Sequence, residues 1–421
     1  AMKKTLGALS LLGASALVLS SCAGGGTPTG GSAATGDLTV WLVGTDTPQD
    51  ARDYLKKTFE DQNDGWTLTV EEKTWADTTE GYVAALSSND APDLVEVGNT
   101  QAPGFIDQGL FADITDIRED LGGDDMLPAF VDSATLDGAL YAAPYYAGSR
   151  VVFYSPATYS GEVPATLSEY VQAGIDNTSS GKSGIYAPGK DWYNALPYVW
   201  ANGGEIATLE GDQWVGGFSS EGGIKGLEML QDVYQNATIA PADADETDPQ
   251  VPFCAGEVGF LSAPSWVQWS ILAPADAEAP GCPDDAGKDL AAYALPGMTE
   301  GEVAPVFAGG SSIAIAAKTD ASEMSQAALE IILSEGYQKI LAENGLIPAR
   351  TSFAQYLPEG QITAEAAKAA ASSKAVPASP QWVEVESAGI IKDALVKIAQ
   401  GGDVTEIATA LDAQIEAILN S

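Results

Sequence analysis

The chain has 421 residues, of which 45% are hydrophobic, and its 59 acidic against 19 basic side chains give a formal net charge of −40 at pH 7. This charge excludes nucleic acid as a partner and passive adhesion to anionic lipid. The chain has no histidine, which excludes Ser-His-Asp and Cys-His catalysis and the usual zinc sites. We expect no metal and no cofactor. The folded part exceeds one ordinary hydrophobic core, which favours two domains of a globular α/β protein.

The first 21 residues have the pattern of a secretion signal. Lys3 and Lys4 form a basic head, and the apolar run from Thr5 to Leu19 is too short to span a bilayer as a helix. The following Leu19-Ser20-Ser21-Cys22 resembles the bacterial lipobox, which implies a lipid on Cys22; the alternative is an ordinary leader with an incidental thiol. Residues 22–36 are rich in glycine and predict a flexible tether.

The next segment predicts a parallel sheet. Strands are expected over Asp37–Val43, Trp66–Glu72 and Asp93–Val97, with helices over Gln49–Asp61 and Thr78–Ser88 between them. Helices that alternate with strands in this way cover a parallel sheet, and ligands bind outside the carboxyl ends of its strands.

A second α/β unit follows the turn signal Asp137-Gly138. Two strands are expected over 139–146 and 150–155, and a helix follows at Thr166 and Glu169, which have capping-box spacing. Further helices are expected over 191–202, 222–235 and 325–343, and a strand over 311–318. The end of the chain is helical, with an apolar stripe that we interpret as core: Val404, Ile407, Leu411, Ile415 and Ile418.

Cys254 and Cys282 are the only cysteines besides Cys22. In an exported chain they are expected to pair as a disulfide, and two unpaired buried thiols are the alternative.

Six segments, taken in order, resemble the extracellular solute-binding proteins of ABC sugar importers, the maltose-binding-protein-like family 1, and most of all its actinobacterial lipoproteins. The segments are APDLVEVGNTQAPGFIDQGLFADIT, DGALYAAPYYAGSRVVFYSPATY, WANGGEI, FCAGEVGFLSAPSW, AGGSSIAIAAK and NGLIPAR. No single segment decides the matter, but their order and spacing are specific to the family.

This resemblance implies a periplasmic-binding-protein-like α/β fold with a ligand cleft between two lobes. The N-terminal lobe would comprise residues 37–146 plus 305–348, and the C-terminal lobe residues 147–304 plus 349–421. Crossovers near Ala147, Pro305 and Pro348 would form the hinge, and an ABC permease would recognise the closed form. The resemblance and the leader together predict a monomer held by its lipid on the outer face of the membrane of a Gram-positive cell.

A sugar site needs flat aromatic rings against the apolar faces of the sugar. Trp192, at a helix start, and Trp266, in the segment where the family commonly places a sugar-facing tryptophan, are the candidate platforms; burial in the core is the alternative for both. Of Tyr145 and Tyr146, which flank a predicted crossover, we expect one to face the cleft and the other to pack inside.

Polar groups must bind the hydroxyls of such a ligand. The loops after the first and third strands offer Asp46, Asn99 and Gln101. Arg350 is a further candidate, with a salt bridge in this very acidic protein as the alternative. Gly310 and Ser311 offer backbone N–H groups, or else form a bulge or tight turn. The acidic run from Asp243 to Asp248 is interpreted as a solvated loop.

These observations favour a protein that captures a carbohydrate, in particular an oligosaccharide, and delivers it to a permease without chemical change. Two alternatives stay open: a binder of peptides or polyamines on the same scaffold, and a glycoside hydrolase that uses a carboxylate pair. We expect no enzyme, because no motif isolates two carboxylates from the many acidic residues.

Overall fold

The computed structural model of the protein describes residues 35–246, 248–276, 280–282 and 285–421. The predicted leader, Cys22 with its predicted lipid, and the predicted linker as far as residue 34 lie outside the described residues. Within those ranges, no helix has both the length and the apolar character needed to cross a membrane. The first strand starts at Gly36, one residue before the expected start of the folded part.

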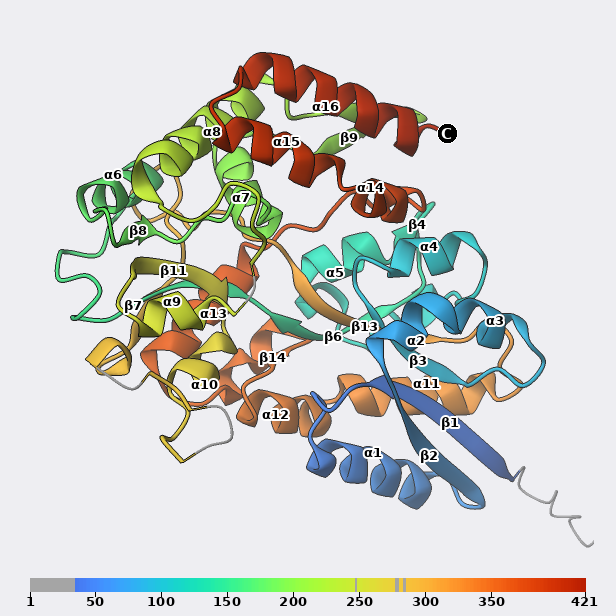
Figure 1. The fold of residues 1–421 in the computed structure, drawn as a ribbon. Coiled ribbons are helices and arrows are strands. Elements are labelled where there is room, and N and C mark those ends of the chain that lie inside the picture. The colour runs from blue at the N-terminus through green and yellow to red at the C-terminus, as the bar shows by residue number, and fades with distance from the viewer. Residues whose placement is uncertain (1–34, 247, 277–279, 283–284) are drawn as a thin grey trace, which may run out of the picture.

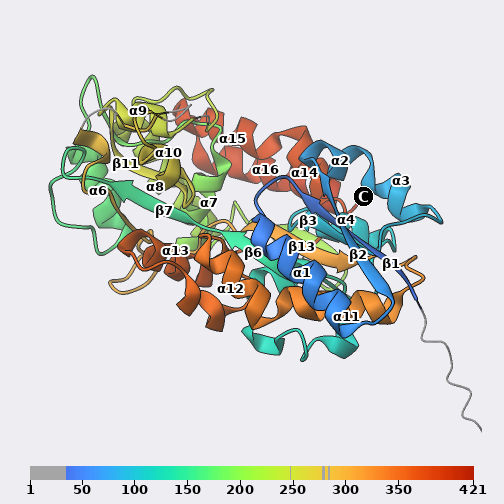
Figure 2. The ribbon, with the colours of Figure 1, turned by 90° about the horizontal axis from the view of Figure 1, so that it is seen from below.

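The larger of two main sheets has six strands in the order β14-β6-β13-β3-β1-β2. Strand β1 is parallel to both β2 and β3, as the alternation of strands and helices predicted, whereas β13 runs antiparallel to β3 and β6. Figures 1 and 2 place α1 and α11 on one face of this sheet and α2 and α3 on the other. The strands are β1 Gly36–Val43, β2 Trp66–Lys73, β3 Leu94–Gly98, β6 Ala143–Gly148, β13 Gly309–Ile315 and β14 Ile347–Pro348.

The second main sheet has four strands in the order β12-β7-β11-β8 and lies to one side of the first in both views (Figures 1 and 2). Strand β11 is antiparallel to β7 and parallel to β8. Its strands are β7 Arg150–Tyr154, β8 Ser183–Ile185, β11 Val258–Pro264 and β12 Ala291–Tyr293. Two small hairpins complete the strands: β4 Thr135–Leu136 with β5 Ala139–Leu140, and β9 Ala207–Glu210 with β10 Gln213–Gly216. The predicted α/β fold class is confirmed.

Helices of 5 to 16 residues cover both sheets. They are α1 Gln49–Gln62, α2 Trp75–Glu80, α3 Tyr82–Ser87, α4 Ala102–Asp107, α5 Pro128–Ser133, α6 Leu167–Asp176, α7 Trp192–Ala201, α8 Glu221–Asp232, α9 Gln250–Cys254, α10 Val267–Ile271, α11 Ser322–Leu333, α12 Glu335–Glu343, α13 Gln361–Ala371, α14 Trp382–Ala388, α15 Ile390–Ala399 and α16 Val404–Leu419. Turns of 3-10 or π-helix are Thr115–Ile117, Gly123–Asp125, Val233–Ala237, Asp285–Gly287 and Thr351–Tyr356.

Three predicted elements are divided in the structure. The strand expected over 139–146 is β5 followed by β6, and the helix expected over 78–88 is α2 and α3, joined at Gly81. The helix expected over 325–343 is α11 and α12. Ser334 separates them because its backbone is extended and its hydroxyl accepts a hydrogen bond from the Tyr337 N–H, which begins a new helix.

The buried apolar side chains form two cores. One collects residues between 38 and 146 and between 313 and 349 around the larger sheet. The other collects residues between 147 and 308 and between 366 and 419, together with Leu127, Ala129, Phe130 and Ile347. The chain passes from one sheet to the other between β6 and β7. The exact lobe boundaries stay a prediction, which this division of the cores supports.

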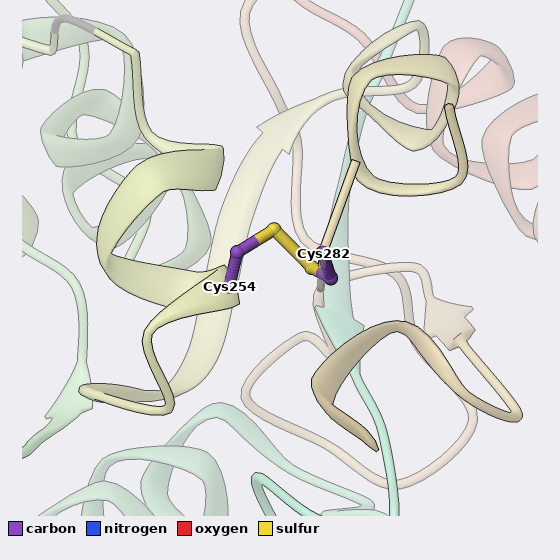
Figure 3. The surroundings of a disulfide bond; sticks show 2 residues. All are labelled: Cys254 and Cys282. Atoms are coloured by element: carbon purple, nitrogen blue, oxygen red, sulfur yellow. A yellow bond between two sulfur atoms is a disulfide. The ribbon is translucent and has the colours of Figure 1, made fainter. Parts of the chain in front are cut away.

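Cys254 and Cys282 form a disulfide that links the end of α9 to the segment after α10, with Cα atoms 4.6 Å apart (Figure 3). The Cys282 N–H also donates to the Ile271 carbonyl at 3.0 Å, so the same segment is held against the end of α10. The bond therefore braces the stretch of chain that carries Trp266.

Candidate functional site

A cleft of about 920 Å³ lies between elements of the two cores. One wall comes from α2, α3 and the turn after β3, and the other from the start of β7, α7, the segment before α10, and α14. The carboxyl end of β3 delivers Asn99, Thr100 and Gln101 to this cleft, as expected for a parallel strand. The volume is near the upper end for small-molecule sites, so the cleft suits a ligand larger than a single small ring.

Aromatic side chains line both walls. Trp75 on the first wall is 44% exposed, and Trp266 on the second is 57% exposed. Trp75 is held at the start of α2 by a capping box, in which Thr74 and Asp77 bond each other's backbone N–H groups. Tyr193 and Phe307 also line the cleft, and the centres of their rings lie 4.9 Å apart. The cleft thus offers several flat apolar surfaces to a ligand.

Gly148, the last residue of β6, makes room for the indole of Trp266. A β-carbon at position 148 would lie 2.2 Å from an atom of that ring, so any other residue there would push the indole away. Next to it, the Ser265 N–H donates to the Ser149 carbonyl at 2.7 Å and ties the tryptophan segment to the passage between the sheets.

Charged groups meet on the second wall. The Arg150 guanidinium donates to both carboxylate oxygens of Glu246, at 2.9 and 2.8 Å, and lies 4.9 Å from the centre of the Tyr193 ring. Behind this pair, the buried Asp191 caps α7 by accepting the Asn194 N–H. Burial raises the pKa of Asp191, and the negative charge of Glu246 raises it further by a smaller amount. Glu386 also lines the cleft and accepts a hydrogen bond from the Trp382 indole at 3.0 Å.

Residues 54–371 match the sequence family of bacterial extracellular solute-binding proteins. The chain belongs to this family. The match covers most of the chain and confirms the resemblance drawn from the six segments. Members of the family bind solutes outside the cytoplasm and are not enzymes.

This solute-binding protein is similar in sequence to a characterised protein and similar in fold to several solved structures. It is 29% identical over 386 residues to the diacetylchitobiose binding protein DasA of Streptomyces coelicolor, with 90% of this chain and 88% of DasA covered. Its fold resembles the sugar-binding protein MalE of Xanthomonas citri, with a TM-score of 0.78, 20% identity, and 91% and 98% of the two chains covered. The cyclic alpha-maltosyl-1,6-maltose binding protein of Arthrobacter globiformis gives a TM-score of 0.77, 20% identity, and coverage of 92% and 100%.

Four of the predicted site residues line the cleft of this solute-binding protein: Asn99, Gln101, Trp266 and Gly310. Asn99 is buried and donates to the Ala308 carbonyl at 2.7 Å, and Gln101 bonds the Gly98 N–H and the Thr78 hydroxyl, each at 3.0 Å. Both amides therefore shape the turn after β3 as well as the cleft. A β-carbon on Gly310 would lie 2.4 Å from the Tyr146 carbonyl, so glycine there also permits a close approach of two strands.

Trp192 lies in the core of the second sheet and does not line the cleft. It is only 5% exposed, and its ring packs 5.4 Å from Phe307 and 6.2 Å from Trp382. The prediction that Trp192 is the leading platform is corrected: the neighbouring Tyr193 occupies the cleft wall.

Tyr145 and Tyr146 both lie inside the first core, so the expectation that one of them faces the cleft is wrong. The Tyr145 hydroxyl bonds those of Thr47 and Tyr337, each at 2.6 Å. The Tyr146 hydroxyl donates to Asp46 at 3.1 Å. Asp46 is exposed outside the cleft and Ser311 is fully buried, so neither of these two predicted residues lines it.

Arg350 forms the salt bridge that was the alternative to ligand binding. Its Nε lies 3.0 Å from Asp125, which also accepts hydrogen bonds from Thr351 and Ser352, away from the cleft. The arginine of the cleft is Arg150, at the start of β7.

Sequence reasoning missed Trp75, Arg150, Tyr193, Glu246 and Glu386. The capping box before Trp75 and the position of Tyr193 beside Trp192 were available as signals. Glu246 lies within the acidic run interpreted as a solvated loop; that interpretation is wrong for this residue, whose side chain is 10% exposed and paired with Arg150.

Glu96 on β3 predicts a dependence of stability on pH. Its side chain is fully buried, and this burial raises its pKa to about 7, although Ser311 and the Val43 N–H favour its ionised form. This pKa is higher in the folded than in the unfolded chain. The contribution of Glu96 to the free energy of unfolding is therefore favourable at low pH and is lost as the pH rises from about 4.5 to about 7. Glu96→Gln is expected to raise the free energy of unfolding by about 3 kcal/mol at pH 8 and much less at pH 4.5. Urea titrations at the two pH values measure this difference, and an equal effect at both would contradict it.

Proposed function

We propose that the protein captures a saccharide outside the cell, in the cleft between its lobes, and delivers it unchanged to an ABC transporter. The observation that carries this proposal is the pair of exposed indoles on opposite walls. Trp75 and Trp266 are 44% and 57% exposed within a cleft, whereas a tryptophan of the core such as Trp382 is 1% exposed. Flat, partly exposed aromatic rings can stack on the apolar faces of a sugar, and neighbouring polar groups can form hydrogen bonds with its hydroxyls.

The relatives agree with this proposal. DasA, similar over nine tenths of this chain, is named for binding diacetylchitobiose, and the two similar folds belong to sugar-binding proteins. We therefore propose an oligosaccharide as the ligand, and chito-oligosaccharides and malto-oligosaccharides as the first classes to test. The proposed leader would export the chain, and a lipid on Cys22 would hold the monomer near its permease.

A thermal-shift panel tests the proposed ligand class. Purified protein is mixed with chito- and malto-oligosaccharides of one to four rings, with spermidine and with a tripeptide. A saccharide at 100 times its dissociation constant is expected to add about 2.7 kcal/mol to the free energy of unfolding and to raise the melting temperature. Recovery of the bound sugar intact after prolonged incubation distinguishes transport from hydrolysis. Stabilisation by spermidine or the peptide alone would contradict the proposal.

A further inference from the structure

The cleft has an uneven distribution of charge. Among the described residues that line it, Arg150 is the only basic side chain, whereas Glu246 and Glu386 are acidic. A cleft arginine ordinarily attracts carboxylates and sulfates, because its planar fork matches their oxygens. Here both ends of the fork are already bound by Glu246.

We propose that Glu246 determines the charge selectivity of the cleft, so that the cleft accepts neutral saccharides and rejects those that carry a carboxylate or sulfate. This inference rests on the proposed function, since it presupposes that the cleft binds a saccharide. It assigns to Glu246, in the acidic run from Asp243 to Asp248, a role in the selection of ligands by charge.

The geometry of the pair makes the neutralisation effective. Both side chains are 10% exposed, and two parallel hydrogen bonds of 2.9 and 2.8 Å join them. With so little water around the pair, salt screens the attraction weakly and the guanidinium charge is almost fully compensated. The Tyr193 ring, 4.9 Å from the guanidinium, covers one face of Arg150 and limits its movement toward a ligand.

The remaining charges around the cleft add to this effect. Lys392 pairs with Asp245 of the loop at 2.5 Å and does not line the cleft. Glu386 lines the cleft, and its hydrogen-bond donor is the neutral Trp382 indole. Burial raises the pKa of this carboxyl, whereas the charge of Lys392 favours its ionised form. In its ionised form Glu386 would repel an anionic sugar, within a chain of net charge −40.

Replacing the partner of Arg150 tests the inference. The ligands are a neutral oligosaccharide from the panel and the same oligosaccharide with its terminal CH₂OH oxidised to a carboxylate. Calorimetry on the wild-type protein is expected to give at least tenfold weaker binding of the oxidised form. In Glu246→Gln, which keeps the shape of the side chain, the oxidised form is expected to gain about tenfold or more relative to the neutral one, because Arg150 becomes free to bind it.

Two further variants make the result specific. Asp243→Asn removes an exposed carboxylate of the same loop, outside the cleft, and is expected to leave the ratio of the two affinities unchanged. Asp191, the other carboxyl beside Arg150, could ionise in place of Glu246, so Glu246→Gln is also combined with Asp191→Asn, which is expected to give an equal or larger gain.

Each failure has a distinct meaning. Equal affinity of wild-type protein for both ligands would overturn the inference even if no variant folds, as would an unchanged ratio in both Glu246→Gln proteins or an equal gain in Asp243→Asn. If the neutral oligosaccharide itself does not bind, the proposed function fails and the inference with it.

Discussion

Replacing Trp266 by alanine is expected to weaken saccharide binding by roughly 100-fold, which corresponds to about 2.7 kcal/mol. The indole is the most exposed ring of the cleft, at 57%, and it rests on Gly148 with no side chain between them. Its loss would remove a flat apolar surface that no neighbouring side chain replaces. Calorimetry with the tightest-binding saccharide of the panel measures the change in affinity.

Trp269 supplies a matched control. It is also a tryptophan near the start of α10 and is 56% exposed, but it does not line the cleft. Trp269→Ala is expected to change the affinity by no more than about twofold. Equal losses in the two variants would mean that α10 as a whole, and not stacking on Trp266, supports binding.

Replacing Trp192 by alanine is expected to lower the free energy of unfolding by about 3–5 kcal/mol. The ring is 5% exposed and packs among Tyr193, Phe307 and Trp382, so its removal would leave a large cavity behind the cleft wall. Denaturant titration, monitored by circular dichroism, measures the loss.

Trp192→Phe separates packing from ligand contact, because phenylalanine fills much of the cavity. It is expected to recover part of the stability and to keep ligand affinity within about threefold of the wild type. A protein that keeps its stability but loses its affinity in both variants would show that the Trp192 ring itself contacts the ligand.

The strands and helices of the first sheet could be predicted because local periodicity reports them. Leu38, Val40 and Leu42 alternate along β1, and Ala51, Leu55 and Phe59 recur at helical spacing in α1; all six side chains are buried. Asn99 and Gln101 were predictable for a related reason, since the residues after a buried parallel strand lie at the edge of the sheet where ligands bind.

The choice between similar neighbours could not be predicted. Trp192 and Tyr193 are adjacent on α7, and packing against Phe307 and Trp382 decides that the first is buried and the second lines the cleft. Arg150 and Arg350 each follow a strand at the passage between the sheets, and only the first reaches the cleft.

By itself, the sequence determined the α/β class through its periodicity and the family through the order of its segments. Its composition, which lacks histidine, excluded catalysis and zinc binding by histidine. Only the tertiary structure decided which aromatic rings face the cleft and that Glu246 neutralises Arg150. The physical reason is that such contacts join residues far apart in the chain, here 96 positions, and no local pattern encodes the packing that brings them together.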